Sequence, residues 1–230
     1  MKRTSKISTV VFVLLVLSFA CGKLQAQDIA RDYTARTGVF SRLYSGKIEP
    51  PYSPRIHQGY PYYGGQNYVK GCIVFNNTLY CDQDIRLDLY KQQPVIFSPA
   101  NQAVVIPSKK VQKVNIYGKT FIWIVPDKDC GLKNEGFYIS YLDGEKINLL
   151  CEERVFIHDK KAVPLVFERS VKYYLGVDGK YYHVKNKSDF LRLFPEDKKQ
   201  INRYAKDNRL DFIDAKERSM ITLAAFCDKL

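Results

Sequence analysis

Histidine is scarce in this chain of 230 residues, which contains only His57, His158 and His183. The three lie in separate segments, and none shows the H-x-x-x-H or histidine–carboxylate spacing that holds a metal ion. The sequence therefore predicts no metal site.

The common signatures of catalysis are also missing. The chain has no G-x-S-x-G elbow, no glycine-rich phosphate loop and no S-x-x-K pair. We therefore expect no catalytic residues, no cofactor and no enzyme. One alternative stays open, in which Cys130, Cys151 or Cys227 is a thiol nucleophile with a histidine as its base. Cys227 on an apolar helix stripe and Cys151 at a strand end fit a core role better.

Only one apolar run is long, and it lies at the N-terminus. The basic start MKRTSK precedes an almost unbroken apolar stretch over 7–20, which is typical of a signal peptide. The run is shorter than the roughly 20 residues needed to span a bilayer. Leu24-Gln25-Ala26 is a plausible cleavage site, so we predict a signal peptide over 1–26 and a mature chain beginning at Gln27. A lipoprotein acylated at Cys21 is the less well fitting alternative.

Export restricts the partners that the chain can meet. Removal of the signal lowers the formal net charge from +12 to +8, and 24 acidic residues are interspersed with the basic ones. This mixture, in the periplasm or outer cell envelope, argues against nucleic acid as a partner. An envelope protein or a glycan is the expected partner. Peripheral membrane contact stays open, since no second apolar run of spanning length occurs.

Short β-prone runs dominate the middle of the chain. GCIVFNNTLYCD places two of them around Asn76-Asn77, residues that tolerate the positive φ of a tight turn. Asp143-Gly144 and Asp178-Gly179 predict two further hairpins with two-residue turns. Around the last of these, we expect Tyr173, Tyr174, Tyr181 and Tyr182 to form cross-strand aromatic pairs.

Helical signals follow residue 187. Ser188 is a candidate N-cap for DFLRLF, Pro195 suits the first turn of a second helix, and Asn208 can end it. Asp214 and Glu217 resemble a capping box. The third helix carries one apolar stripe with the residues Met220, Leu223, Ala224 and Cys227 at helical spacing.

Three blocks of the sequence resemble a family of uncharacterised exported proteins from Gram-negative bacteria. The blocks are GYPYYGGQNYVKG, IRLDLYKQQPVIFSP and the stretch from YYLGVDGKYYHV to the C-terminus. The resemblance implies export, a β-rich body and C-terminal helices, but no activity. The chain departs from the family pattern at Gln92 and Gln93, where acidic residues are usual.

A tyrosine cluster is the candidate binding site. Tyr60, Tyr62 and Tyr63 stand beside Pro61 and two glycines. Such a cluster suits a flat platform for a sugar ring or an extended peptide, and it also suits a corner packed on a sheet.

The first hairpin predicts a disulfide. If Asn76-Asn77 is a two-residue turn, counting outward places Cys72 opposite Cys81 at a position without backbone hydrogen bonds, where Cα atoms lie about 4.5 Å apart. Disulfides span about 4.4 to 6.8 Å between Cα atoms, and exported proteins mature where thiols oxidise.

These observations predict an α+β protein in which antiparallel hairpins and meanders form the body and two or three short helices follow. The expected organisation is a signal peptide over 1–26, an irregular segment over 27–66, a β body over 67–186 and a helical segment over 187–230. The function we expect is a non-catalytic envelope module that binds a protein or glycan partner. A thiol-dependent enzyme and a structural assembly factor are the alternatives.

Overall fold

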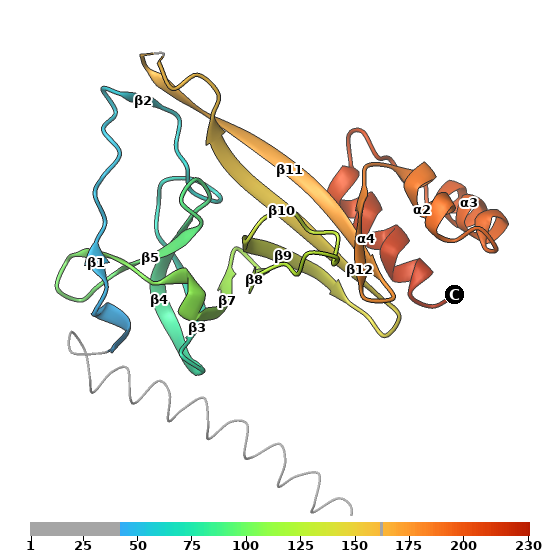
Figure 1. The fold of residues 1–230 in the computed structure, drawn as a ribbon, viewed down its shortest axis with the longest axis horizontal. Helices are drawn as coiled ribbons and strands as arrows, with labels where there is room; N and C mark the ends of the chain where they lie inside the picture. Colours follow the sequence, from blue (N-terminus) through green and yellow to red (C-terminus); the bar gives the residue numbers. More distant parts are fainter. Residues whose placement is uncertain (1–41, 162) are drawn as a thin grey trace, which may run out of the picture.

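The computed structural model describes residues 42–161 and 163–230 (Figure 1). The predicted signal peptide, its cleavage site and the lipid attachment at Cys21 lie outside the described residues. The strands are β1 Lys47–Ile48, β2 His57–Gln58, β3 Val69–Phe75, β4 Thr78–Asp88, β5 Gln93–Phe97, β6 Ala103–Val105, β7 Val111–Ile116, β8 Lys119–Ile124, β9 Gly136–Asp143, β10 Ile147–Ile157, β11 Leu165–Val177 and β12 Lys180–Val184. The helices are α2 Lys187–Leu193, α3 Lys198–Asp207 and α4 Lys216–Cys227, with 3-10 turns η2 Arg42–Tyr44 and η3 Ser108–Lys110.

The predicted α+β class is confirmed, with a mostly antiparallel sheet followed by three short helices. The strands lie in the order β1-β6-β5-β4-β3-β7-β8-β9-β10-β11-β12, and each neighbouring pair in this order is antiparallel. β2 stands off this path and pairs in parallel with β11. Figure 1 shows β10 and β11 as a long ribbon whose far end reaches β2, while the helices lie at the opposite end.

The first turn forms as predicted because both asparagines adopt positive φ, 49° at Asn76 and 61° at Asn77. The strands β3 and β4 then pair in the predicted register. The Cys72–Cys81 disulfide is confirmed, with Cα atoms 4.1 Å apart. The ladder is irregular just beyond it, between Gly71 and Ile73.

The predicted two-residue turn at Asp143-Gly144 is wrong. β9 ends at Asp143 and β10 begins at Ile147, so Asp143 pairs with Asn148. The reason lies 80 residues further along the chain. The carboxylate of Asp228 accepts hydrogen bonds from the backbone N–H groups of Lys146 (2.9 Å) and Ile147 (3.0 Å), and this contact holds the turn in its longer form.

The predicted tyrosine pairs across β11 and β12 are also wrong. The turn at Asp178-Gly179 forms, with φ of 49° and 77°. In the register that it sets, Tyr181 faces Gly176 and Tyr182 faces Leu175. The remaining two rings find other partners, since Tyr173 stacks on Tyr141 and Tyr174 lies against Tyr138 and His183. Their ring centroids are 6.2, 6.2 and 5.5 Å apart, respectively.

Three helices form in the predicted segment, but their starts differ. Pro195 does not lie in the first turn of the second helix, because α3 begins at Lys198 after Asp197. Asn186, not Ser188, caps α2, because its side chain accepts from the Ser188 N–H. α4 starts without a side-chain cap after Ala215, since Glu217 instead accepts from Lys119 and Tyr141. Asn208 ends α3 as predicted.

The apolar stripe of α4 completes the main hydrophobic cluster. All four stripe residues are buried, and α4 packs on β9 and β10. The cluster continues without a break to Leu43 in η2. Within the described ranges, no helix has the length and hydropathy needed to cross a membrane.

Candidate functional site

The three predicted site tyrosines lie between β2 and β3, and the chain turns them in different directions. Tyr60 is exposed, whereas Tyr62 is buried. Tyr63 is half-buried and packs against Tyr117 and Phe121, at centroid distances of 5.8 and 4.8 Å. Tyr60 and Tyr62 line one groove, and Tyr63 does not line it.

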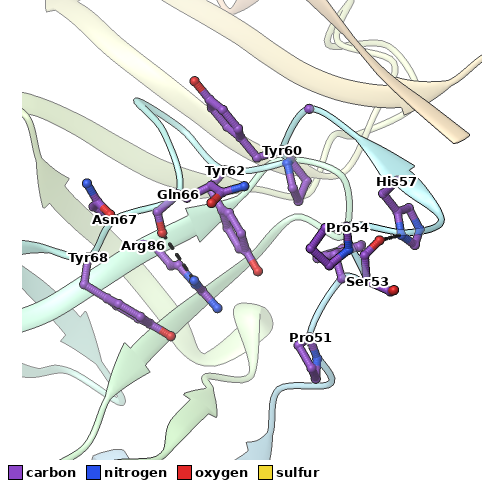
Figure 2. A pocket seen from close by; sticks show the side chains of 13 residues that line it. Pro51, Ser53, Pro54, His57, Tyr60, Tyr62, Gln66, Asn67, Tyr68 and Arg86 are labelled. Carbon is purple, nitrogen blue, oxygen red and sulfur yellow. Dashed lines mark hydrogen bonds between the residues drawn. The ribbon is translucent and has the colours of Figure 1, made fainter. Parts of the chain in front are cut away.

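The groove, which we call the tyrosine groove, has a volume of about 730 Å³. The loops on either side of β2, the segment before β3 and one residue of β4 form its walls (Figure 2). The residues that line it are Pro51, Tyr52, Ser53, Pro54, His57, Gly59, Tyr60, Pro61, Tyr62, Gln66, Asn67, Tyr68 and Arg86. Four tyrosines and three prolines make its surface rich in flat, rigid side chains.

Arg86 forms the floor of the tyrosine groove. Its guanidinium carbon lies 4.1 Å from the ring centroid of Tyr62 and 4.4 Å from that of Tyr68. The guanidinium also bonds to the carboxylate of Glu49 and donates to the backbone carbonyl of Gln66 at 3.3 Å. Glu49 in turn accepts from the Tyr62 hydroxyl at 2.9 Å. These contacts fix both tyrosine rings, so the floor is preformed.

A second buried carboxylate anchors the adjacent wall. Asp88 accepts from the Tyr52 hydroxyl at 2.7 Å and from the backbone N–H groups of Tyr90 and Lys91, both at 2.8 Å. Burial raises the pKa of Asp88, against the opposing effect of these donors. Burial and the contact with Asp88 raise the pKa of Tyr52, so its hydroxyl remains a protonated donor.

The parallel pairing of β2 with β11 closes the far end of the wall. Phe167 of β11 stacks on His57 with ring centroids 5.3 Å apart, and Tyr52 meets the edge of both rings. The backbone N–H of Leu165 donates to the carbonyl of Ile56 at 2.6 Å. His57 is thus held as an aromatic packing residue of the wall.

The mouth of the tyrosine groove differs from its floor. The side chains of Tyr60, Gln66 and Asn67 are exposed, and Figure 2 shows them on the upper side of the groove, above Arg86. None of these three has a side-chain hydrogen bond to the rest of the described chain. The mouth therefore offers a ring face and two amides that can each donate and accept.

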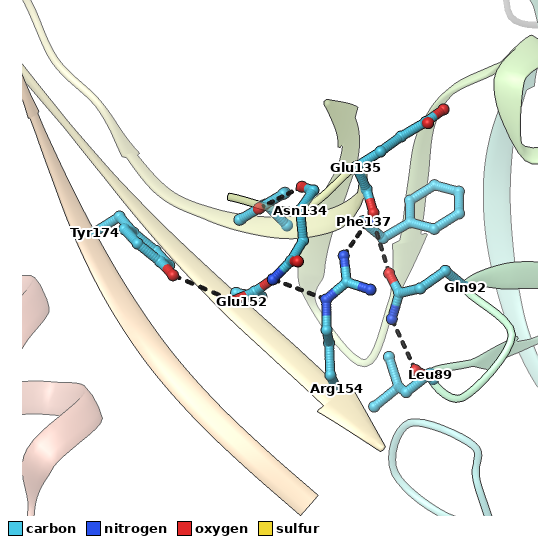
Figure 3. Close-up of polar contacts among 9 residues, drawn as sticks. Leu89, Gln92, Asn134, Glu135, Phe137, Glu152, Arg154 and Tyr174 are labelled. Carbon is cyan, nitrogen blue, oxygen red and sulfur yellow. Dashed lines mark hydrogen bonds and ion pairs between the residues drawn. The ribbon is translucent and has the colours of Figure 1, made fainter. Parts of the chain in front are cut away.

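A polar cluster between β9, β10 and β11 lies outside the tyrosine groove (Figure 3). Buried Glu152 accepts from Asn134 at 2.7 Å, from Arg154 at 2.7 Å and from Tyr174 at 3.2 Å. Burial alone would raise the pKa of Glu152, but the three donors outweigh it and lower that pKa. With its hydrogen bonds satisfied within the protein, this cluster is suited to support of the fold.

The described cysteines outside the disulfide are placed as core residues. Cys151 and Cys227 are buried, and Cys130 is half-buried. Burial raises the pKa of Cys227 to about 12, with Asp197 adding to the effect, and burial also raises the pKa of Cys151. A thiolate is therefore disfavoured at both. In the part of the chain that the structure describes, no group of three or more His, Cys, Asp or Glu residues is arranged to hold a metal ion.

The sequence pattern missed most of the residues around Tyr60 and Tyr62. Arg86 and Asp88 carried a usable signal, because they alternate with Ile85, Leu87 and Leu89 and so share the face opposite the apolar one. Tyr52 and Glu49 carried no such signal, since they belong to irregular chain.

Comparison with protein-family models, curated proteins and solved structures found no significant match.

Proposed function

We propose that the protein is an exported, non-catalytic binding module of the cell envelope, and that its tyrosine groove holds a glycan. The observation that carries this proposal is the combination of an exposed ring at the mouth, Tyr60, with the rigid aromatic floor of Tyr62, Arg86 and Tyr68. A concave, largely preformed site with a few convergent polar groups is typical of small-ligand binding.

The chemistry of the lining favours a sugar ring. Tyrosine joins a flat apolar face to a polar tip, and it loses little side-chain entropy on binding because it has only two χ angles. A pyranose presents apolar C–H groups on its face and hydroxyl groups at its edge. The Tyr60 ring suits the face, and the unengaged amides of Gln66 and Asn67 suit the hydroxyl groups.

Three further observations support the exported and non-catalytic parts of the proposal. The Cys72–Cys81 disulfide is compatible with maturation in an oxidising compartment. The raised pKa values of Cys151 and Cys227 oppose a thiolate nucleophile at either residue. His57, the histidine of the groove, stacks on Phe167 and thus has a structural partner.

Binding of defined oligosaccharides tests the proposal. The mature, disulfide-bonded chain is titrated calorimetrically with hexasaccharides of the cello-, chito-, manno- and galacturono- series. For any member that binds, Tyr60→Ala should weaken binding about tenfold, which corresponds to the loss of one stacked ring.

Tyr182→Ala is the matched control. Tyr182 is 40% exposed, close to the 44% of Tyr60, but it lies on β12 and does not line the groove. Its affinity should stay within about twofold of the parent value. Equal losses in the two variants, or no binding of any series at millimolar concentration, would contradict the proposal.

A further inference from the structure

We infer that the ligand of the tyrosine groove is an acidic glycan, one that carries carboxylates on its sugar rings. This inference rests on the proposed glycan function and adds the charge of the ligand. It comes from where the charged side chains around the groove lie relative to its surface.

The acidic groups at the groove are buried beneath it. Glu49 is 4% exposed and Asp88 is 0% exposed. Glu49 is paired with Arg86 and Tyr62. The carboxylate of Asp88 accepts hydrogen bonds from the Tyr52 hydroxyl and from two backbone N–H groups. No Asp or Glu occurs among the residues that line the described groove. The surface that a ligand meets therefore has no exposed carboxylate to repel an anion.

Two exposed basic residues, in contrast, adjoin the lining residues of the groove, and we call this edge its rim. Lys91 is exposed, and its Nζ lies 4.3 Å from the ring centroid of Tyr52 in the groove wall. Arg55 is exposed and stands in the chain between the lining residues Pro54 and His57. Neither has an ion pair with another described residue. Lys91 over an aromatic ring of the wall, with Arg55 next to Pro54 in the chain, favours a ligand ring that bears a negative charge.

The floor and the rim have different roles in binding. Arg86 is engaged by Glu49 and the two tyrosine rings, so it serves as a positioning residue for the floor. Arg55 and Lys91 are exposed, and a guanidinium such as that of Arg55 can hold a carboxylate with two hydrogen bonds. A uronate ring would thus stack on tyrosine while its carboxylate meets the rim.

A pair of ligands that differ only in charge tests this inference. The mature chain is titrated with hexagalacturonate and with its fully methyl-esterified form, which keeps the rings and removes the charges. At low ionic strength, about 20 mM, the acid form should bind at least about tenfold more tightly. This ratio should fall towards one as salt is raised to about 0.5 M, because salt screens exposed charges.

Two double variants test whether Arg55 and Lys91 cause the preference for the acid form. Arg55→Gln combined with Lys91→Gln should reduce the preference for the acid form to about twofold. Lys199→Gln combined with Arg218→Gln makes the same change of net charge at exposed positions of the C-terminal helices and should leave the preference intact. Loss of the preference in both double variants would overturn the inference, because it would indicate attraction by net charge alone.

The outcomes separate the two proposals. Equal affinity for the acid and the ester would overturn the acidic ligand and leave the glycan function standing. Failure of both forms and of the neutral hexasaccharides to bind would overturn the glycan function itself. Tighter binding of the acid that Tyr60→Ala does not weaken would place the anion outside the groove and overturn the inference.

Discussion

The side-chain amide of Gln92 links the turn between β4 and β5 to the start of β9. Its Oε1 accepts from the Phe137 N–H and its Nε2 donates to the Leu89 carbonyl, both at 2.8 Å (Figure 3). The residue is buried with a φ of 53°. An ionised carboxylate at this position would have no proton to donate to the Leu89 carbonyl.

We therefore expect Gln92→Glu to destabilise the protein by about 1 to 3 kcal/mol, the typical cost of an unsatisfied buried polar group. Urea unfolding at pH 7 measures the difference. Gln102→Glu makes the same chemical change at an exposed position and should cost less than about 0.5 kcal/mol. Similar costs for the two variants would show that the Gln92 amide has no special role.

The buried carboxylate of Glu152 gives a dependence of stability on pH. Its folded pKa is below the ordinary 4.5 because three donors converge on it and outweigh burial. The stabilisation that it contributes is therefore present above pH 4.5 and is lost as the pH falls through the folded pKa. In Glu152→Gln, an amide N–H would face those donors.

The variant should be less stable than the parent by about 1 to 3 kcal/mol at pH 7. The gap should narrow as the pH falls below 4.5. Urea unfolding of both proteins between pH 3 and pH 7 gives the two curves. A gap that is constant across this range would contradict the assignment of Glu152 as the titrating group.

At the scale of elements, local signals were sufficient where the partners are local. Asn76-Asn77 fixed a turn, a register and with them the disulfide, because two positive φ values and a count of residues determine all three. Counting outward from Asp178-Gly179 in the same way places Tyr181 opposite Gly176. The expected tyrosine pairs were thus an error of counting, not a failure of the pattern.

Distant partners account for the other differences. The turn after Asp143 is held in its longer form by hydrogen bonds to Asp228, which is 81 to 82 residues away in the sequence. Glu217 does not fill its predicted capping role, because its carboxylate accepts hydrogen bonds from Lys119 and Tyr141. The tyrosine groove depends on the pairing of β2 with β11, two segments more than 100 residues apart. A two-residue strand such as β2 has no periodicity to detect, so most of the groove could not be predicted from the sequence.

At the scale of the whole molecule, α4 joins the C-terminal segment to strands β9 and β10 of the sheet. Its stripe lies in the main hydrophobic cluster, and three polar contacts reinforce it. These are Glu217 with Lys119 and Tyr141, Asp228 with the turn before β10, and Ser219 with the Asp211 carbonyl. Helix and sheet therefore belong to one core.

Removal of residues 214–230 should accordingly abolish the cooperative thermal melt, since each fully buried large apolar side chain contributes about 1.5 to 3 kcal/mol. Circular dichroism and calorimetry follow the transition.

A point variant keeps the test informative if the truncated chain does not fold. Leu223→Ala, at a site that is 0% exposed, should cost about 2 to 5 kcal/mol, as expected for a cavity in a packed core. Ile213→Ala, at a site just before α4 that is 89% exposed, should cost less than about 0.5 kcal/mol. An unchanged melt after truncation, or equal losses of stability in the two point variants, would mean that α4 is a detachable arm whose apolar stripe binds a partner and does not belong to the core.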